Sequence, residues 1–140
     1  PLIASDRAMA EEYLVIPDLI RPLTEKHWPG ALTVVGKVGR ALASGAVRSD
    51  GTVALRVSSH PVAKALAAGL GRPIVATSAN VSGLSSCYSI RTFLKQIHDA
   101  KHPEPDFVID VGPIPRRKPS TLVAVVNGKV AVLRQGTVKV

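Results

Sequence analysis

Short apolar runs alternate with amphipathic stretches along the whole chain of 140 residues. The runs are rich in Val, Ile, Leu and Ala and have the length of strands, whereas the stretches between them repeat apolar residues at helical spacing. This alternation is typical of an α/β sheet. No internal repeat, low-complexity tract or linker interrupts it, so we expect a single domain over residues 1–140.

The individual elements follow from the same pattern. Strands are expected at the start of the chain and over residues 31–38, 52–57, 74–79, 107–111, 121–126 and 129–133. Helices are expected from the capping pair Ser5-Asp6 to His27 with an end or interruption at Pro17, over 61–69, and after the serines of 85–89. Asn127-Gly128 predicts a hairpin, because a type I′ turn needs positive φ at both central residues. The expected fold class is a twisted, open, mixed sheet with helices and a C-terminal β-hairpin.

Composition and charge narrow the class of protein. A hydrophobic content of 46% argues against disorder, and no apolar run is long enough to cross a bilayer. The first residues lack a signal-peptide pattern and the single cysteine fits a reducing compartment, so a cytoplasmic protein is expected. A net charge of +8 favours anionic partners such as nucleotides or RNA. Since only 4% of residues are aromatic, any contact with nucleic acid is expected to be mainly with phosphates.

Candidate binding residues stand at the ends of the expected strands. In residues 72–83, an apolar run leads directly into small polar residues that include Ser78 and Asn80. Ligands of open α/β sheets bind outside the carboxyl ends of strands, although an ordinary polar loop has the same composition. Arg56 and Arg134 each close a strand, and a guanidinium suits a carboxylate or a phosphate. For each arginine, a side chain extending from the sheet edge into solvent is the alternative.

A catalytic nucleophile or a metal centre of a familiar kind is not expected. Ser78, His60 and Asp110 are the residue types of a hydrolytic triad, but the serine lacks the Gly-x-Ser-x-Gly elbow. His98 and His102 have no cysteine or carboxylate at ligand spacing nearby. Asp110 precedes Val-Gly and is more typical of a turn than of a magnesium ligand. No catalytic residue and no metal ligand is therefore assigned.

Six segments, taken in order, carry a resemblance to known proteins. They are Trp28-Pro-Gly-Ala-Leu-Thr33, Thr52-Val-Ala-Leu-Arg-Val57 with His60-Pro61, Pro73-Ile-Val-Ala-Thr-Ser-Ala-Asn-Val-Ser-Gly83, Asp110-Val-Gly112, Pro119-Ser-Thr121 and Leu133-Arg-Gln-Gly136. Together they resemble the YrdC/Sua5 family of threonylcarbamoyl-AMP synthases. The resemblance implies a YrdC-like sheet with a basic concave face. It also implies a nucleotidyltransferase that joins L-threonine, bicarbonate and ATP into threonylcarbamoyl-AMP and pyrophosphate, for the t6A modification of tRNA.

The resemblance also implies roles for particular residues. Arg56 would hold the threonine carboxylate, with Ser78 and Ser120 orienting the amino acid. Contacts with ATP would come from Thr52, Asn80 and Arg134. ATP would be a substrate accompanied by Mg²⁺, and no bound organic cofactor is expected. The effect of Tyr88 on the nucleotide contact stays open, because many relatives have a small or polar residue at its position.

The chain departs from the family pattern at its beginning. Relatives start with a strand bearing a Pro-Thr-(Asp/Glu)-Thr-like segment, then a helix and a Lys-x-Arg motif that grips phosphates. Pro1-Leu2-Ile3 resembles the residues just after that motif, so the expected domain is N-terminally incomplete.

The alternative function is a non-catalytic YrdC-like module that binds nucleotide, tRNA or double-stranded RNA through its basic face. Other t6A-pathway proteins are further candidate partners, and no membrane partner is expected. A carbamoyl-transfer module of the hydrogenase-maturation kind is disfavoured by the single cysteine and the lack of a flanking domain.

Overall fold

The chain divides into two compact units in the computed structural model, which describes all 140 residues. Unit 1 comprises residues 1–76 and 118–140, and unit 2 comprises residues 77–117. Along the sequence, unit 2 is thus one continuous segment, which is preceded and followed by the two parts of unit 1. That the whole chain acts as one YrdC-like domain stays a prediction.

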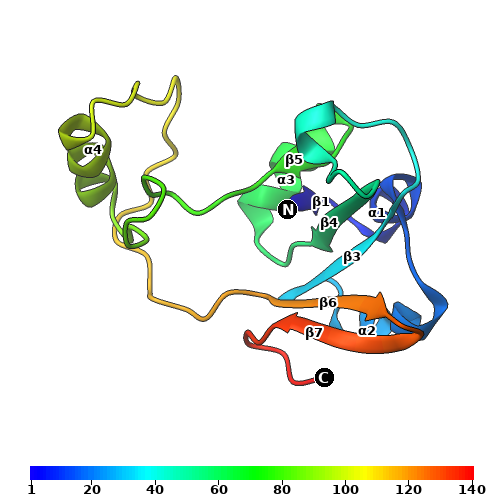
Figure 1. The fold of residues 1–140 in the computed structure, drawn as a ribbon. Coiled ribbons are helices and arrows are strands. Elements are labelled where there is room, and N and C mark those ends of the chain that lie inside the picture. Colours follow the sequence, from blue (N-terminus) through cyan, green and yellow to red (C-terminus); the bar gives the residue numbers. More distant parts are fainter. The chain divides into compact units, whose positions relative to one another are not determined.

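A seven-stranded mixed sheet forms the frame of unit 1 (Figure 1). The strands are β1 (Leu2–Ala4), β2 (Leu14–Val15), β3 (Leu32–Val38), β4 (Thr52–Val57), β5 (Ile74–Val75), β6 (Thr121–Val126) and β7 (Lys129–Arg134). Their order is β5-β1-β4-β3-β6-β7, and β2 pairs with β3. β1 runs parallel to β4 and β3 parallel to β6, whereas the other pairs are antiparallel. The expected open mixed sheet is confirmed.

The helices of unit 1 begin and end close to where the sequence predicts. They are α1 (Arg7–Tyr13), α2 (Arg21–His27) and α3 (Pro61–Leu70), with short 3₁₀ helices η1 (Asp18–Ile20) and η2 (Ser44–Ala46). Asp6 caps α1, since its carboxylate accepts a hydrogen bond of 2.8 Å from the Met9 N–H. The expected end at Pro17 is too late: α1 ends at Tyr13 because Leu14 becomes extended and pairs with β3.

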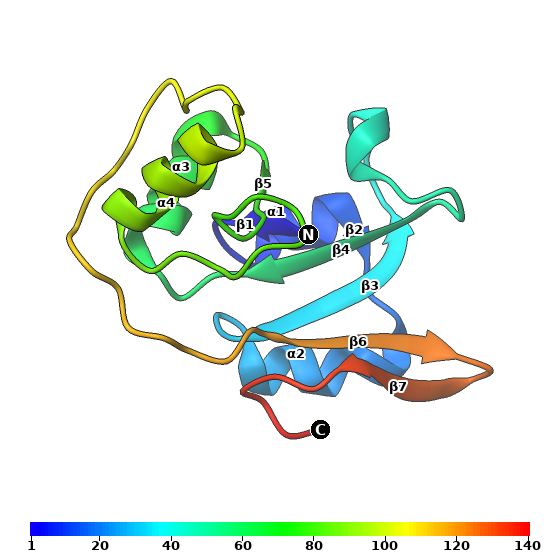
Figure 2. The same ribbon diagram turned by 60° about the vertical axis from the view of Figure 1, so that its left-hand side comes forward.

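Side-chain alternation along β4 separates the two faces of the sheet. Val53, Leu55 and Val57 are at most 1% exposed, whereas Arg56 on the other face is half-buried. The buried face packs against α1 and α2, which lie behind the strands in Figure 2. The core cluster consists of Leu2, Ala4, Ala10, Tyr13, Leu14, Ile16, Ile20, Trp28, Leu32, Val34, Val53, Leu55, Val57 and Val123. Thr52 and Arg56 therefore project from the opposite face.

The C-terminal hairpin has the turn that the sequence predicts. β6 and β7 are antiparallel, with Val126 paired to Lys129. Asn127 has a φ of 50° and Gly128 a φ of 70°, the positive values that a type I′ turn requires. The predicted hairpin is confirmed.

Unit 2 contains one helix, α4 (Ile90–Asp99), flanked by irregular chain. Ser89 caps α4 by accepting a hydrogen bond of 3.3 Å from the Thr92 N–H. The strand predicted over 107–111 is wrong: these residues form no ladder and Phe107 is 93% exposed. Extended apolar chain becomes a strand only beside another strand, and unit 2 has none.

The strand predicted over 74–79 is shorter than expected. β5 ends at Val75, which pairs with Leu2 of β1, and the Ala76 N–H then reaches the Pro1 carbonyl. The residues from Thr77 onward form no further ladder. No helix of the protein is long and apolar enough to cross a membrane.

A candidate anion site on the sheet of unit 1

Three side chains meet where β3 and β6 begin and β7 ends. The parallel register pairs Leu32 with Thr121, so Thr33 and Ser120, next to this pair, are neighbours. Thr33 Oγ1 lies 2.7 Å from Ser120 Oγ. Arg134 donates from Nε and Nη2 to the Ser120 carbonyl at 3.2 and 2.9 Å, and from Nη2 to Ser120 Oγ at 3.1 Å. The structure thus brings the predicted Ser120 and Arg134 together and adds Thr33, which the sequence analysis left without a role.

The chain just after Arg134 passes close to the segment before β6. The Gly136 N–H donates to Thr121 Oγ1 at 3.1 Å, and that hydroxyl donates to the Val138 carbonyl at 2.6 Å. A Cβ on Gly136 would lie 2.1 Å from the Pro119 carbonyl oxygen, a distance that no real contact allows. Only glycine therefore lets the chain after β7 pass so close to the segment before β6.

Arg56 adds a second cation on the same face of the sheet. Val34 pairs with Leu55, so Thr33 and Arg56 both project from the opposite face. Neither Arg56 nor Arg134 forms a salt bridge with a carboxylate. Burial, and secondarily the Arg134 guanidinium, lower the pKa of Arg56. Two guanidinium groups without carboxylate partners on one face of the sheet favour the binding of an anion there.

Thr52 lies at the other end of β4, where its polar groups form hydrogen bonds with Asp50. Its backbone N–H donates to Asp50 Oδ1 at 2.9 Å, and its hydroxyl donates to the same oxygen. These two bonds lower the pKa of Asp50. Four residues of strand separate Thr52 from Arg56 by about 13 Å at ~3.3 Å per residue. The structure does not bring Thr52 to the two arginines, and its contact with ATP stays a prediction.

Ser78 and Asn80 belong to unit 2, where Asn80 braces the loop after β5. Its Nδ2 donates to the carbonyls of Val81 and Leu84 at 2.9 and 3.0 Å. Asn80 Oδ1 is buried without a hydrogen-bond partner, which leaves an acceptor free for a donor or a cation. The Ser78 side chain is exposed. The roles predicted for both residues in ligand binding stay predictions.

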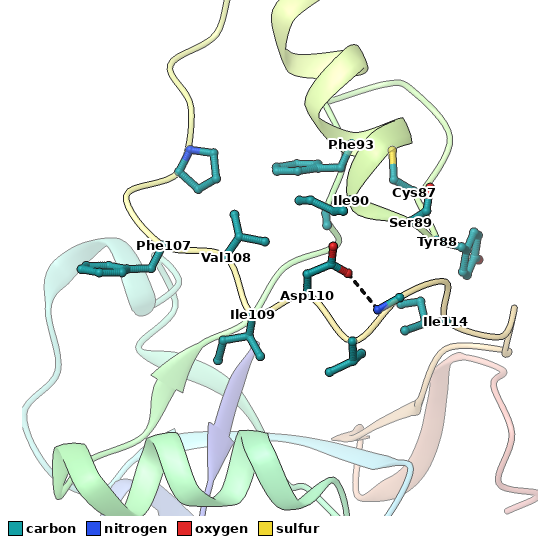
Figure 3. Close-up of a pocket in the computed structure, with 14 residues that line it drawn as sticks. Cys87, Tyr88, Ser89, Ile90, Phe93, Phe107, Val108, Ile109, Asp110 and Ile114 are labelled. Atoms are coloured by element: carbon teal, nitrogen blue, oxygen red, sulfur yellow. Dashed lines mark hydrogen bonds between the residues drawn. The ribbon is translucent and has the colours of Figure 1, made fainter.

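Unit 2 also contains an apolar pocket of about 290 Å³ between α4 and the segment 107–114 (Figure 3). Asp110 Oδ1 accepts a hydrogen bond of 2.8 Å from the Gly112 N–H, so Asp110 forms the expected turn.

The Arg116 guanidinium lies 5.3 Å from the centre of the Tyr88 ring. No group of three or more His, Cys, Asp or Glu side chains is arranged to hold a metal ion.

Comparison with known proteins decides the family. Residues 1–136 match the model of the Sua5/YciO/YrdC family, which is described as "Telomere recombination". The chain belongs to this family. The resemblance seen in the six sequence segments is thereby confirmed.

The relatives of this Sua5/YciO/YrdC chain include curated threonylcarbamoyl-AMP synthases. It is 36% identical to that of Aliivibrio fischeri over 99 residues, which cover 66% of this chain and 53% of the relative. It is 29% identical to that of Marinobacter nauticus over 115 residues, which cover 81% of this chain and 58% of the relative. Sua5 of P. abyssi, solved in complex with L-threonine, matches with a TM-score of 0.80 and 29% identity over 97% of this chain and 40% of that one. The chain thus spans little more than half the length of these two curated relatives.

Proposed function

We propose that this chain takes part in the synthesis of threonylcarbamoyl-AMP from L-threonine, bicarbonate and ATP, the step that supplies the t6A modification of tRNA. Two curated relatives carry the name of that enzyme, and a structural relative was solved with L-threonine. The observation that carries the proposal is the pair of arginines, Arg56 and Arg134, without carboxylate partners beside the hydroxyls of Thr33 and Ser120. Such a site suits two anionic substrates better than one neutral substrate.

The geometry favours a division of labour between the two arginines. Arg56 makes no side-chain hydrogen bond, so its full guanidinium fork is available for the threonine carboxylate. Ser120 orients the amino acid beside it. The Nε and Nη2 atoms of Arg134 already contact Ser120, which leaves Nη1 for a phosphate oxygen of ATP. Thr52, Ser78 and Asn80 enter this proposal from the family motifs alone.

The chemistry asks the protein chiefly to hold and orient its substrates. Bicarbonate supplies carbon dioxide, which the threonine amine captures as a carbamate, and the hydroxide of bicarbonate leaves as water with the proton that the amine releases. The carbamate oxygen then attacks the α-phosphorus of ATP, and pyrophosphate leaves. Fixed cations stabilise the charge that builds up on the phosphoryl oxygens. Mg²⁺ would be bound by the phosphates of ATP, where it would help to neutralise their charge, because this ion keeps several waters and prefers substrate phosphates.

The first test is pyrophosphate release with ATP, bicarbonate and Mg²⁺, with and without L-threonine. Release that depends on threonine is expected. Arg56→Ala should raise the KM for threonine about 10- to 100-fold, since a charge-assisted hydrogen bond contributes ~1.5–3 kcal/mol, and Arg134→Ala should do so for ATP. Arg40→Ala is the matched control, because Arg40 lies beyond the far end of β3 and pairs with Glu12.

Two results would contradict the proposal. One is release that ignores threonine, and the other is no release from a folded chain. In the second case, binding of nucleotide or RNA that both arginine substitutions weaken would support the alternative of a non-catalytic module.

A further inference from the structure

The hydroxyl of Ser120 has two neighbours in unit 1. Thr33 Oγ1 lies 2.7 Å away and Arg134 Nη2 lies 3.1 Å away. A serine hydroxyl has one hydrogen to donate and two lone pairs that accept, whereas a guanidinium only donates. Ser120 therefore accepts a hydrogen bond from Arg134, and the direction of the bond to Thr33 remains to be assigned.

The burial of Thr33 settles that direction. Thr33 is 1% exposed, and its hydroxyl has no partner other than Ser120. If Ser120 donated to Thr33, the Thr33 hydrogen would be buried without an acceptor, and a buried unpaired donor is costly. If Thr33 donates to Ser120, that hydrogen has an acceptor.

We infer that Thr33 is a positioning residue that makes the Ser120 hydroxyl a dedicated donor to the substrate. With its lone pairs facing Thr33 and Arg134, Ser120 Oγ has only its hydrogen left to offer. The group that it meets must then be an acceptor, and the two neighbouring guanidinium groups favour an anionic oxygen. The inference rests on the proposed function and deepens it: Ser120 contacts a carboxylate or carbamate oxygen of the amino acid, not its amine.

A double-mutant cycle tests this assignment. Thr33→Val removes the hydroxyl and keeps the shape, Ser120→Ala removes the donor, and the double variant measures their coupling. Calorimetry should show that Thr33→Val and Ser120→Ala each weaken L-threonine binding about 5- to 10-fold, and that the double variant is no weaker than Ser120→Ala. Thr33→Ser, which restores a donor, should recover most of the affinity. ATP affinity should change less than about 2-fold in Thr33→Val and Thr33→Ser.

Inorganic phosphate, titrated into the same proteins, separates the inference from the proposed function. If wild type fails to bind threonine but binds phosphate with the same coupling, the dedicated donor stands and the proposed function is wrong. Additive effects on the binding of both ligands would overturn the role of Thr33 and leave the proposed function intact. If Thr33→Val lost threonine and ATP affinity equally and had a lower melting temperature, the role of Thr33 would be structural only. If wild type bound neither threonine nor phosphate, both the inference and the proposed function would be overturned.

Discussion

Gly136, two residues beyond Arg134, lies against the segment that leads into β6. The chain after β7 approaches the Pro119 carbonyl so closely that an added Cβ would lie 2.1 Å from its oxygen. Gly136→Ala must push the two segments apart, and we expect it to lower the free energy of unfolding by about 1–3 kcal/mol, as overpacking does. Urea denaturation measures this loss, and calorimetry with ATP should show a weaker affinity.

The control for that substitution is Gly69→Ala in α3. No atom lies within 4 Å of the Cβ that it adds, and alanine is the better helix former, so a gain of about 0.5–1 kcal/mol is expected. If both substitutions had the same effect on the free energy of unfolding, the close approach at Gly136 would not be the reason that a larger residue is unfavourable there.

Single residues differed in how well the sequence revealed them. Arg56 and Arg134 stood out because each is a charged residue at the end of an apolar run, and Ser120 stood out because it lies in a segment that resembles the family. Thr33 did not, since its partner Ser120 lies 87 positions away and only the register of β3 with β6 brings the two hydroxyls together. The one available signal was that Thr33 ends a segment that resembles the family.

Among the elements, those fixed by near neighbours were predictable and those fixed by distant partners were not. Asp6 and Ser89 cap their helices, and Asn127-Gly128 makes its turn, through contacts within a few residues. Residues 107–111 have the composition of a strand, but a strand also needs a partner within reach. Composition alone could not show that unit 2 lacks one.

The cap of α1 gives a prediction that depends on pH. Hydrogen bonds from the Met9 N–H and from the Ser5 hydroxyl lower the pKa of Asp6. The stability that the ionised cap contributes is therefore present above the unfolded pKa of about 3.9 and is lost as pH falls through the lower folded value. Asp6→Ala should cost about 1 kcal/mol at pH 7 and less near pH 3, measured by urea denaturation at both pH values.

Ser89→Ala is the matched control for the cap of α1. It removes a cap that cannot ionise, so its cost should be the same at both pH values. A pH-independent cost of Asp6→Ala would show that the charge of Asp6 is unimportant for the cap.

For the whole molecule, the density of packing differs between the two units. Unit 1 is built around the core cluster, whereas in unit 2 every residue from His98 to Arg117 is exposed. Exposed chain with few backbone hydrogen bonds is cut first by proteases. Brief digestion with trypsin followed by mass spectrometry should find cleavage after Arg116 and Arg117 before any cleavage after Lys37 or Arg56, which lie in paired strands. Early cuts in β3 or β4 would contradict this order.

The sequence predicted a mixed sheet from the alternation of apolar runs, but not the order of its strands. β6 follows β5 in the chain and yet lies beside β3, far across the sheet (Figure 1). The pairing of β6 with β3 depends on contacts between residues far apart in the sequence, and no local pattern of residues predicts it.

The parallel pairing of β3 with β6 also has a kinetic consequence. The hairpin of β6 and β7 closes over two residues, and local hairpins form within about 1–10 μs. Docking that hairpin beside β3 closes a loop of more than eighty residues, the kind of contact that folding chains make slowly and late. Thr33 meets Ser120 only in that docking step. A bound substrate should therefore slow unfolding while leaving the refolding rate almost unchanged, because the transition state does not yet contain the site that the ligand recognises.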